Sequence, residues 1–395
     1  MRPKRGVGAA PVRGRRVLVR VDFNVPLDGH GGVADDRRVR EALPTLEHLR
    51  TAGARTIVMS HLGRPAGRRE MALSLRPVAR RLGSLLGRPV PLAEDAVGIP
   101  ALQAVARLGN GDALLLENLR FHAGEEANDP AFAAQLAQLG ELFVEDAFGA
   151  VHRAHASTVG VPRRLPSVAG LLVEREVRGL SPLVEGAARP YVVVVGGAKV
   201  ADKLPLLASF LDRADRLLIG GALAFPFLRA RGMALGATPA EPGVEGAADE
   251  FLRKAGASST EVILPSDLVV DRPGGVVTAA LGAGGVPADG VGRDIGPGTV
   301  AEFAAGLAGS RTVFWNGPLG LAEDPRFANG TAAVLGRLAG IPGYHVAAGG
   351  DSARVAEGLG VLSGFQFVST GGGAALEFVQ GLELPGLAVL PDAEP

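Results

Sequence analysis

The amino-acid sequence predicts an α/β fold of two doubly wound parallel-sheet domains, Rossmann-like in layout and joined by a hinge helix. Short runs rich in Val, Ile and Leu alternate with helical segments along the chain. This alternation is the pattern of βαβ units whose sheets are covered on both faces. With 395 residues, 47% of them hydrophobic, the chain is long enough to form two cores. A helix-like segment followed by Pro190 separates the two halves.

The apolar runs give the expected strands in order. They are 16–21, 56–60, 113–116 and 142–147 in the front half, and 191–195, 216–220, 261–265, 312–315, 344–348 and 365–369 in the back half. Helical patterns such as 38–53 and 75–87 lie between them. We therefore place an N-terminal domain at 1–172, an interdomain helix at 173–188 and a C-terminal domain at 189–381.

The composition excludes several classes of protein. Lys and Arg number 41 and Asp and Glu number 41, and this zero net charge argues against nucleic-acid or membrane-surface binding. The absence of cysteine excludes disulfides, thiolate metal sites and cysteine nucleophiles. The basic N-terminal segment lacks the apolar run of a signal peptide, and no apolar stretch approaches ~18 residues. We expect a soluble, cytoplasmic protein.

The charge is distributed unevenly along the chain. Residues 1–172 carry 24 Lys and Arg against 17 Asp and Glu, a balance of +7, and the remainder carries 17 against 24, a balance of −7. Helix faces that differ by chance would also produce such a split. The functional interpretation is that the front half binds an anion and the back half binds a cation.

Polar side chains follow the expected front-half strands. In open parallel sheets, ligands bind beyond the carboxyl ends of the strands. Arg38 comes after the loop of the first strand, and the residues directly after the four strands are Asp22, Asn24, His61, Arg64, Arg120, His152, Arg153 and His155. Guanidinium groups hold metal cations poorly but match the planar geometry of carboxylate and phosphate. This half of the chain therefore predicts a site for a small anion.

The segment "VHRAHAST" (151–158) leaves alternatives open. His152 and His155 are three residues apart, a weak zinc signal without an HExxH frame. No Gly-x-Ser-x-Gly sequence places a serine beside them, which argues against a catalytic triad. Each histidine taken singly is also compatible with a structural residue beside the sheet.

Glycine-rich turns follow the back-half strands and enter helices, a pattern that lets backbone amides approach phosphates. Lys199 and Lys203 are four residues apart, so on the first turns of a helix they would face the same way. Asp351 follows two glycines and is a candidate Mg²⁺ ligand. No P-loop or dinucleotide-binding fingerprint is present. The two halves together predict a kinase acting on a small anionic metabolite.

Eight motifs, in order and covering the chain from about residue 15 to 390, resemble the phosphoglycerate kinase family. They are "VRVDFNVPL" (19–27), "SHLGRP" (60–65), "LLLENLRF" (114–121), "FGAVHRAHAST" (148–158), "GGAKVADKL" (196–204), "VFWNGPLG" (313–320), "GGDSARV" (349–355) and "FVSTGGGAALEF" (367–378).

The resemblance implies a glycolytic phosphotransferase with a carboxyl group as acceptor. Its substrates would be 1,3-bisphosphoglycerate with ADP and 3-phosphoglycerate with ATP, and its cofactor Mg²⁺ bound with the nucleotide. It further implies a monomer without nucleic-acid or membrane partners, and two lobes that close over the substrates by hinge bending. The first lobe would bind 3-phosphoglycerate and the second the nucleotide, with the tail 382–395 packing back on the first.

The resemblance also implies site residues, position by position. Those for 3-phosphoglycerate are Asp22, Asn24, Arg38, His61, Arg64, Arg120 and Arg153. Those for the nucleotide are Lys199, Lys203, Gly220, Gly221, Asn316, Glu323, Gly349, Gly350, Asp351 and Ser352, with Asp351 as the metal ligand. Arg38 and Lys199 are the expected catalytic residues. Arg38 is preferred to Arg37 because it precedes a β-branched apolar residue, as in the family.

Three positions depart from the family pattern: Ala222, Pro226 and Arg293. All three are expected on the adenine side, so they bear on nucleotide preference. Two alternative functions stay open, a related acyl-phosphate kinase with another acceptor and a binding module that has lost turnover. The presence of Arg38, Lys199 and Asp351 argues against the second.

Overall fold

The structure is a computed structural model that describes residues 3–239 and 241–393, except for the side chains of Ala283 and Asp351. The chain divides into two compact units. Unit 1 runs to Arg178 and includes the segment from Leu382 onward, and unit 2 comprises Gly179–Gly381. Within the described residues, no helix is both long and apolar enough to cross a membrane.

Unit 1 is built on a five-stranded sheet in the order β3-β2-β1-β4-β5, and every strand pair is parallel. The strands are β1 (Arg16–Val21), β2 (Arg55–Met59), β3 (Ala113–Leu115), β4 (Leu142–Asp146) and β5 (Ser167–Ala169). The first four coincide within two residues with the expected strands. Because all strands are parallel, their carboxyl ends lie at one edge of the sheet.

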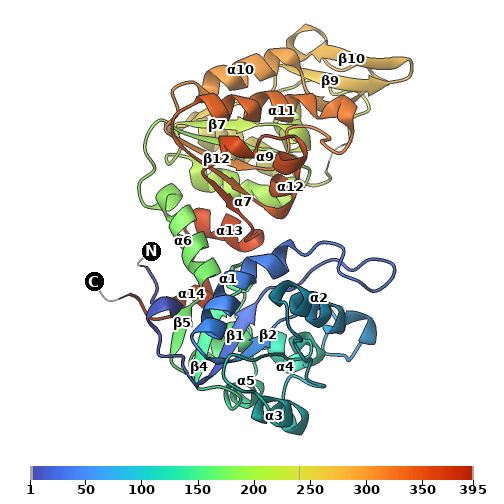
Figure 1. Ribbon diagram of the computed structural model, residues 1–395. Helices are drawn as coiled ribbons and strands as arrows, with labels where there is room; N and C mark the ends of the chain where they lie inside the picture. Colours follow the sequence, from blue (N-terminus) through green and yellow to red (C-terminus); the bar gives the residue numbers. More distant parts are fainter. Residues whose placement is uncertain (1–2, 240, 394–395) are drawn as a thin grey trace. The chain divides into compact units, whose positions relative to one another are not determined.

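Helices cover both faces of this sheet (Figure 1). They are α1 (Arg37–Thr51), α2 (Arg76–Leu86), α3 (Gly98–Ala106), α4 (Ala123–Glu126) and α5 (Pro130–Ala137). Val17 and Val19 of β1 pack in a cluster with α1 and α2, whereas Leu18 packs in a second cluster with α3 and α5. Successive residues of a strand point to opposite faces, so Arg20 shares the face of Leu18.

Local signals begin and end these helices. Asp129 caps α5 by accepting a hydrogen bond from Phe132 N at 2.8 Å, and Pro130 occupies the first helical position. α2 ends at Gly87, whose φ of +66° is the left-handed conformation that terminates helices and favours glycine. The helix boundaries are therefore set by nearby residues.

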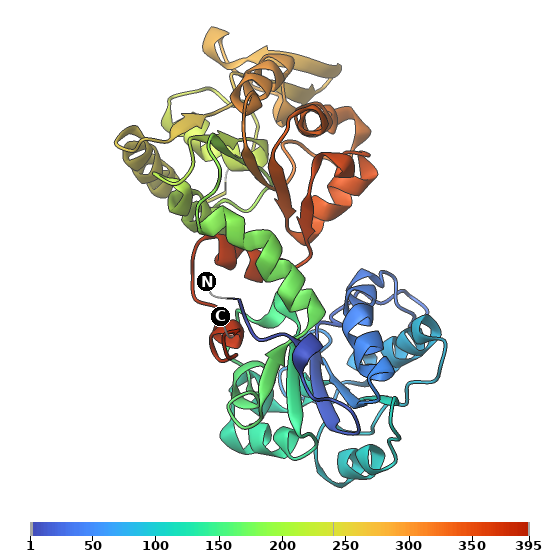
Figure 2. The same cartoon turned by 60° about the vertical axis from the view of Figure 1, so that its left-hand side comes forward.

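The C-terminal segment belongs to unit 1. It contains the short helix α14 (Pro385–Ala388) and runs beside the N-terminal segment (Figure 2). Lys4 Nζ pairs with Asp392 Oδ1 at 2.8 Å, and Gly386 N donates to Val151 O at 2.8 Å. The second bond attaches this segment to the turn that carries Arg153.

Unit 2 contains a six-stranded parallel sheet in the order β14-β13-β12-β6-β7-β8. Its strands are β6 (Tyr191–Val195), β7 (Arg216–Ile219), β8 (Glu261–Ile263), β12 (Thr312–Asn316), β13 (Tyr344–Ala348) and β14 (Phe367–Ser369). All five residues of the central strand β6 are buried. This burial explains the uninterrupted valine run from which the strand was predicted.

The helices of unit 2 also flank its sheet (Figure 1). They are α7 (Val200–Phe210), α8 (Phe225–Ala230), α9 (Glu245–Gly256), α10 (Pro297–Leu307), α11 (Asn329–Gly336), α12 (Gly350–Gly358) and α13 (Gly373–Val379). Phe303 of α10 and Val334 of α11 pack in one core cluster with Trp315 of β12. On the other face, the ring of Phe210 in α7 lies 5.6 Å from that of Phe314. Residues adjacent on β12 thus bury opposite faces.

The sequence patterns missed a small antiparallel sheet in unit 2. It has the order β10-β9-β11 and consists of β9 (Asp267–Arg272), β10 (Gly275–Ala280) and β11 (Val291–Ile295). Most residues of β10 are exposed, so it lacks the apolar run by which buried strands are recognised. Pro273 and Gly274, between two runs of β-branched residues, were the available hairpin signal.

The helix between the two halves differs from its expected range of 173–188. The helix α6 is Leu171–Val184, and the boundary between the units falls inside it, after Arg178. It ends before Gly186, whose φ of +131° is incompatible with a helix. The helical pattern in the sequence continues past this glycine because periodicity carries no information about φ.

Candidate functional site

In unit 1 hydrogen bonds join residues that follow three different strands. Arg38 Nη1, from α1, donates to Asp22 Oδ2 at 2.9 Å and to Asn24 O at 3.1 Å. Asn24 Oδ1 accepts from Gly63 N at 2.9 Å, and Gly63 O accepts from Arg120 Nη1 at 2.8 Å. These bonds link the loops after β1, β2 and β3 at the carboxyl edge of the sheet.

His61 lies inside this group, 5% exposed. Burial holds its pKa well below the ordinary value, and the positive charges of Arg20, Arg120, Arg153 and Arg38 lower it further, in that order. His61 is therefore a neutral imidazole at physiological pH. A neutral histidine surrounded by guanidinium groups suits an anionic ligand.

Two of the predicted arginines differ in how far they are restrained. Arg64 is exposed, and no hydrogen bond or ion pair joins its guanidinium to the residues described. Arg153, half-buried after β4, donates from Nε to His152 Nε2 at 3.1 Å. Both are placed to move onto a ligand with little loss of existing hydrogen bonds.

His152 and His155, for which a zinc site was the alternative, lie among these arginines. Burial lowers the pKa of His155 to about 4, assisted by Arg120, Arg20 and Arg153. Burial and then the charge of Arg153 also lower the pKa of His152. The described residues contain no group of three His, Cys, Asp or Glu placed to hold a metal ion. The surrounding positive charge disfavours a cation at this position.

A buried layer that the sequence analysis missed lies against the site. Arg20, 1% exposed, donates from Nε to Ser157 Oγ at 2.9 Å. Ser157 Oγ donates in turn to Glu125 Oε1 at 2.5 Å, and Glu125 is completely buried. The available signal was an arginine inside the otherwise apolar strand "RVLVRV", because a charge in a central strand requires buried partners.

In unit 2 the loops after β6, β7 and β12 pack against one another. Gly197 N donates to Pro318 O at 2.7 Å, and Gly197 O accepts from Leu223 N at 2.8 Å. A side chain at Gly317, whose φ is +88°, would lie 2.5 Å from Gly196 O. The glycines here permit close approach of backbone to backbone, and Gly220 and Gly221 belong to the same cluster of loops.

The two lysines are placed differently from each other. Lys199 is exposed and precedes α7, which begins at Val200, so the expectation that both lysines lie on the first turns is wrong for Lys199. Lys203 lies within α7 and its Nζ hydrogen-bonds Gly196 O. The helix starts one residue later than the spacing argument assumed.

Glu241 occupies the N-terminus of α7. Its carboxylate accepts hydrogen bonds from Val200 N at 2.7 Å and from Ala201 N at 3.2 Å. An acidic side chain therefore already satisfies the amides that a phosphate would use at this helix. Sequence spacing gave no indication of this contact, since Glu241 lies 41 residues from Val200.

Among the described side chains, none forms a capping hydrogen bond at the N-terminus of α12. Gly349, with φ +105°, precedes it, and Ser352 Oγ accepts from Gly317 N at 2.8 Å. Asn316 Nδ2 donates to Ala348 O at 2.7 Å, whereas Asn316 Oδ1 is buried without a partner in the described residues. Gly349, Gly350, Asn316 and Ser352 thus lie together, and the side chain of Asp351 falls outside the described part of the structure.

Glu323 lies exposed in the turn after β12. In the same turn Leu321 N donates to Arg293 O at 2.9 Å, so the unusual Arg293 lies beside the Glu323 segment. Pro226 occupies the first turn of α8, where a missing backbone N–H costs no helical hydrogen bond. Ala222 lies in the short helical turn Gly221–Ala224.

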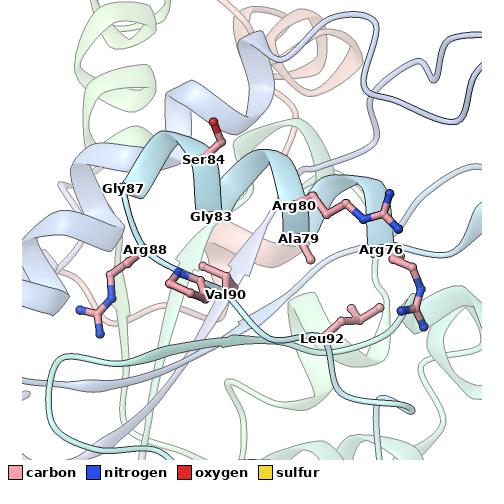
Figure 3. A pocket seen from close by; sticks show the side chains of 10 residues that line it. Arg76, Ala79, Arg80, Gly83, Ser84, Gly87, Arg88, Val90 and Leu92 are labelled. Atoms are coloured by element: carbon pink, nitrogen blue, oxygen red, sulfur yellow. The ribbon is translucent and has the colours of Figure 1, made fainter.

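A separate pocket of about 590 Å³ lies beside α2 in unit 1 (Figure 3). Arg76, Arg80 and Arg88 contribute to its lining, along with Val90 and Leu92. Arg88 is engaged by Asp112 Oδ1 at 2.6 Å. None of the predicted site residues lines this pocket.

Comparison with known proteins decides the family. The family model described as phosphoglycerate kinase matches residues 7–382. The chain belongs to the phosphoglycerate kinase family. The phosphoglycerate kinase of Coprothermobacter proteolyticus is 49% identical over 388 residues, which is 98% of each chain. That of Salinispora arenicola is 50% identical over 394 residues, 97% of each.

Solved phosphoglycerate kinases have the same fold. The structure from Coxiella burnetii aligns with a TM-score of 0.88 at 36% identity, covering 98% of both chains. The structure from Pyrococcus horikoshii aligns with a TM-score of 0.87 at 32% identity, covering 97% of this chain and 98% of that one. The predicted phosphoglycerate kinase family, fold class and kinase function are confirmed.

Proposed function

We propose that unit 1 of this phosphoglycerate kinase binds 3-phosphoglycerate or 1,3-bisphosphoglycerate, and that unit 2 binds the magnesium complex of ADP or ATP. The observation that carries the proposal is the convergence of Arg38, Arg120 and Arg153 around the neutral His61. A trianionic substrate is neutralised by such a set, and planar guanidinium groups match its carboxylate and phosphate.

Within unit 1 we assign the substrate to the seven residues expected from the sequence. They are Asp22, Asn24, Arg38, His61, Arg64, Arg120 and Arg153. Arg38 is the catalytic member because its side chain, 39% exposed, is anchored by Asp22 with donors left over for a reacting group. The acceptor carboxylate of 3-phosphoglycerate is ionised at neutral pH, so the transfer needs no general base. Catalysis consists of positioning and of neutralising charge on the transferring phosphoryl group.

Within unit 2 we assign the nucleotide phosphates to the N-terminus of α12, where no described side chain forms a cap, and to the exposed Lys199. The further proposed contacts are Lys203, Gly220, Gly221, Asn316, Glu323, Gly349, Gly350 and Ser352. The N-terminus of α7 is excluded from phosphate binding as long as Glu241 caps it. Lys199 is the proposed catalytic cation of this unit.

The residues around α12 fit a magnesium ion bound together with phosphates. Mg²⁺ takes oxygen ligands, commonly one or two carboxylates with waters and phosphate oxygens. Asn316 Oδ1, buried and without a partner in the described residues, and the carboxylate of Asp351 would supply such oxygens. When bound, the ion would offset the charge of the nucleotide phosphates. We further propose that the protein is a cytoplasmic monomer.

A coupled assay with 3-phosphoglycerate, ATP and Mg²⁺ tests the assignment. We expect turnover, and we expect it to be lost in Arg38→Ala and Lys199→Ala. Arg107→Ala, which changes an exposed arginine at the end of α3, is the matched control and should retain activity. Turnover with acetate but not with 3-phosphoglycerate would favour a kinase with another acceptor. Binding of both ligands without turnover would favour an inactive binding module.

A further inference from the structure

Among the hydrogen bonds of the described residues, the buried Arg20 of β1 contacts the proposed substrate site through His61. Its Nη2 lies 3.1 Å from His61 Nδ1. The other two nitrogens are also engaged, Nε with Ser157 Oγ at 2.9 Å and Nη1 with Val21 O. With 1% of its surface exposed, Arg20 cannot itself reach a ligand. It is therefore no direct anion ligand, although its charge acts on the site.

The chemistry of this contact determines the state of the imidazole. A guanidinium group has five N–H donors, has no acceptor and stays protonated in proteins. At 3.1 Å from a donor, Nδ1 of His61 has to be the acceptor, so it carries no proton. The ring proton then resides on Nε2. No hydrogen bond joins Nε2 to another described residue, and this leaves its N–H available to a ligand.

The surroundings of His61 act in the same direction. Positive charge faces it from Arg20 on β1, Arg120 after β3, Arg153 after β4 and Arg38 on α1. The buried carboxylate nearest to Arg20 in the hydrogen-bond network is that of Glu125, on α4, which reaches Arg20 through Ser157. Glu125 thus lies close to the charge of Arg20, on the far side of Ser157. A second proton on the imidazole would face four cations.

We propose that Arg20 is a positioning residue that holds His61 in the neutral Nε2–H tautomer, so that His61 donates a hydrogen bond to the anionic substrate. This inference rests on the proposed function, because the substrate assignment of His61 is part of it. Ser157, which itself donates to Glu125, restrains the guanidinium by accepting a hydrogen bond from Nε. The network gives a reason for a charged residue in the most central strand of the unit 1 sheet.

The first test reads the ring directly and needs no turnover. The full-length protein is labelled with ¹⁵N-histidine, and two-bond ¹H–¹⁵N correlation spectra are recorded without ligand between pH 5.5 and pH 8. His61→Gln identifies the signal among the seven histidines. We expect one tautomer, protonated on Nε2, across the range. A ring protonated on Nδ1, or one that gains a second proton in this range, overturns the proposal.

The second test asks whether Arg20 acts through His61. Calorimetry measures 3-phosphoglycerate affinity for Arg20→Gln, Arg20→Lys, His61→Gln and the double variant Arg20→Gln/His61→Gln. Loss of a hydrogen bond to a charged group costs roughly 10- to 100-fold in affinity. We expect that loss in Arg20→Gln, partial recovery in Arg20→Lys, and no further loss when Arg20→Gln is added to His61→Gln.

Additive losses in the double variant overturn the proposal, because they would mean that Arg20 acts on the whole fold. If Arg20→Gln does not fold, the tautomer of His61 measured in the unsubstituted protein still tests the proposal. Failure of the proposed function has a different signature. In that case the unsubstituted protein shows the Nε2–H tautomer but binds no 3-phosphoglycerate, which overturns the substrate assignment and leaves the Arg20–His61 contact established.

Discussion

Arg37 and Arg38 are adjacent in the sequence but have different partners. Arg38 donates to Asp22 at 2.9 Å, whereas Arg37 pairs with Asp35 in its own loop at 2.6 Å. Arg38 is thereby tied to Asp22 and Asn24 directly after β1, whereas Asp35 lies just before α1. The preference for Arg38 over Arg37, made from the residue that follows it, agrees with this geometry.

We expect Arg38→Ala to lower kcat by about 10²–10³-fold or more, because removal of one charge-stabilising donor has that effect in other enzymes. Nucleotide affinity should change less, since Arg38 belongs to unit 1. Steady-state kinetics of Arg38→Ala and of the matched Arg37→Ala provide the measurement. Near-normal turnover in Arg38→Ala, or equal losses in both variants, would sink the assignment.

Asp146 gives the stability of the protein a pH dependence. Burial raises the pKa of its carboxyl from 3.8 to about 8, and Oδ2 has no partner in the described residues. A carboxyl with a raised folded pKa favours folding most below its unfolded pKa, and this contribution is lost as pH rises toward the folded value. Ionisation of Asp146 therefore lowers the free energy of unfolding progressively as pH rises from about 4 to about 8.

Asp146→Asn, a neutral residue of the same shape, should remove this loss. We expect the variant to gain at least about 1 kcal/mol over the unsubstituted protein between pH 5 and pH 8, one pKa unit being worth about 1.4 kcal/mol. Urea unfolding followed by circular dichroism measures the difference. Asp249→Asn, at an exposed position of α9, is the control. A difference that does not change with pH would contradict the prediction.

At the scale of single elements, α7 depends on a residue outside its own segment. No side chain of its flanking residues caps it, and Glu241 supplies the acceptor for its first amides. We expect Glu241→Ala to lower the free energy of unfolding by about 1 kcal/mol, as loss of a helix cap does. Denaturant unfolding gives the value.

Glu245→Ala makes the same change at an exposed position on the first turn of α9 and is the matched control. A loss no larger than that of the control would show that Glu241 does not stabilise α7.

At the scale of the whole molecule, the front-half excess of +7 predicts a salt dependence. Binding of 3-phosphoglycerate alone should weaken as sodium chloride rises from about 0.01 to 0.3 M, because the Debye length shrinks over this range. Calorimetry at several concentrations tests it, with sucrose as an uncharged control. Salt-independent affinity would mean that the charge split is an accident of surface composition.

Domain closure is the second whole-molecule prediction. In-line transfer needs reacting atoms about 3–3.5 Å apart, so the ternary complex has to bring the two ligands together. Each ligand alone shifts a conformational equilibrium only by its differential affinity for the two states. We expect small-angle scattering to give a smaller radius of gyration with both ligands than with either one or none. Equal radii in all states would remove the hinge interpretation of α6.

The sequence alone determined the strands of the two parallel sheets other than β5, their order along the chain and the residues after each of them. These features depend on neighbours within a few positions, so periodicity and composition carry them. β10 was not predicted because most of its residues are exposed. The predicted helix continued past Gly186 because a hydrophobic pattern carries no information about a positive φ. The eight motifs sufficed for the family, since each is long and they occur in order.

Only the tertiary structure decided which residues have partners. The contacts of Arg20 with His61, Arg20 with Ser157 and Glu241 with Val200 span 41, 137 and 41 positions of the chain. No local pattern encodes a pairing across such distances, because it depends on which loops the folded sheet places side by side. Burial is decided in the same way, and with it the neutral state of His61. The sequence named the candidate residues of the site, whereas the fold determined their charge states and the hydrogen bonds that hold them.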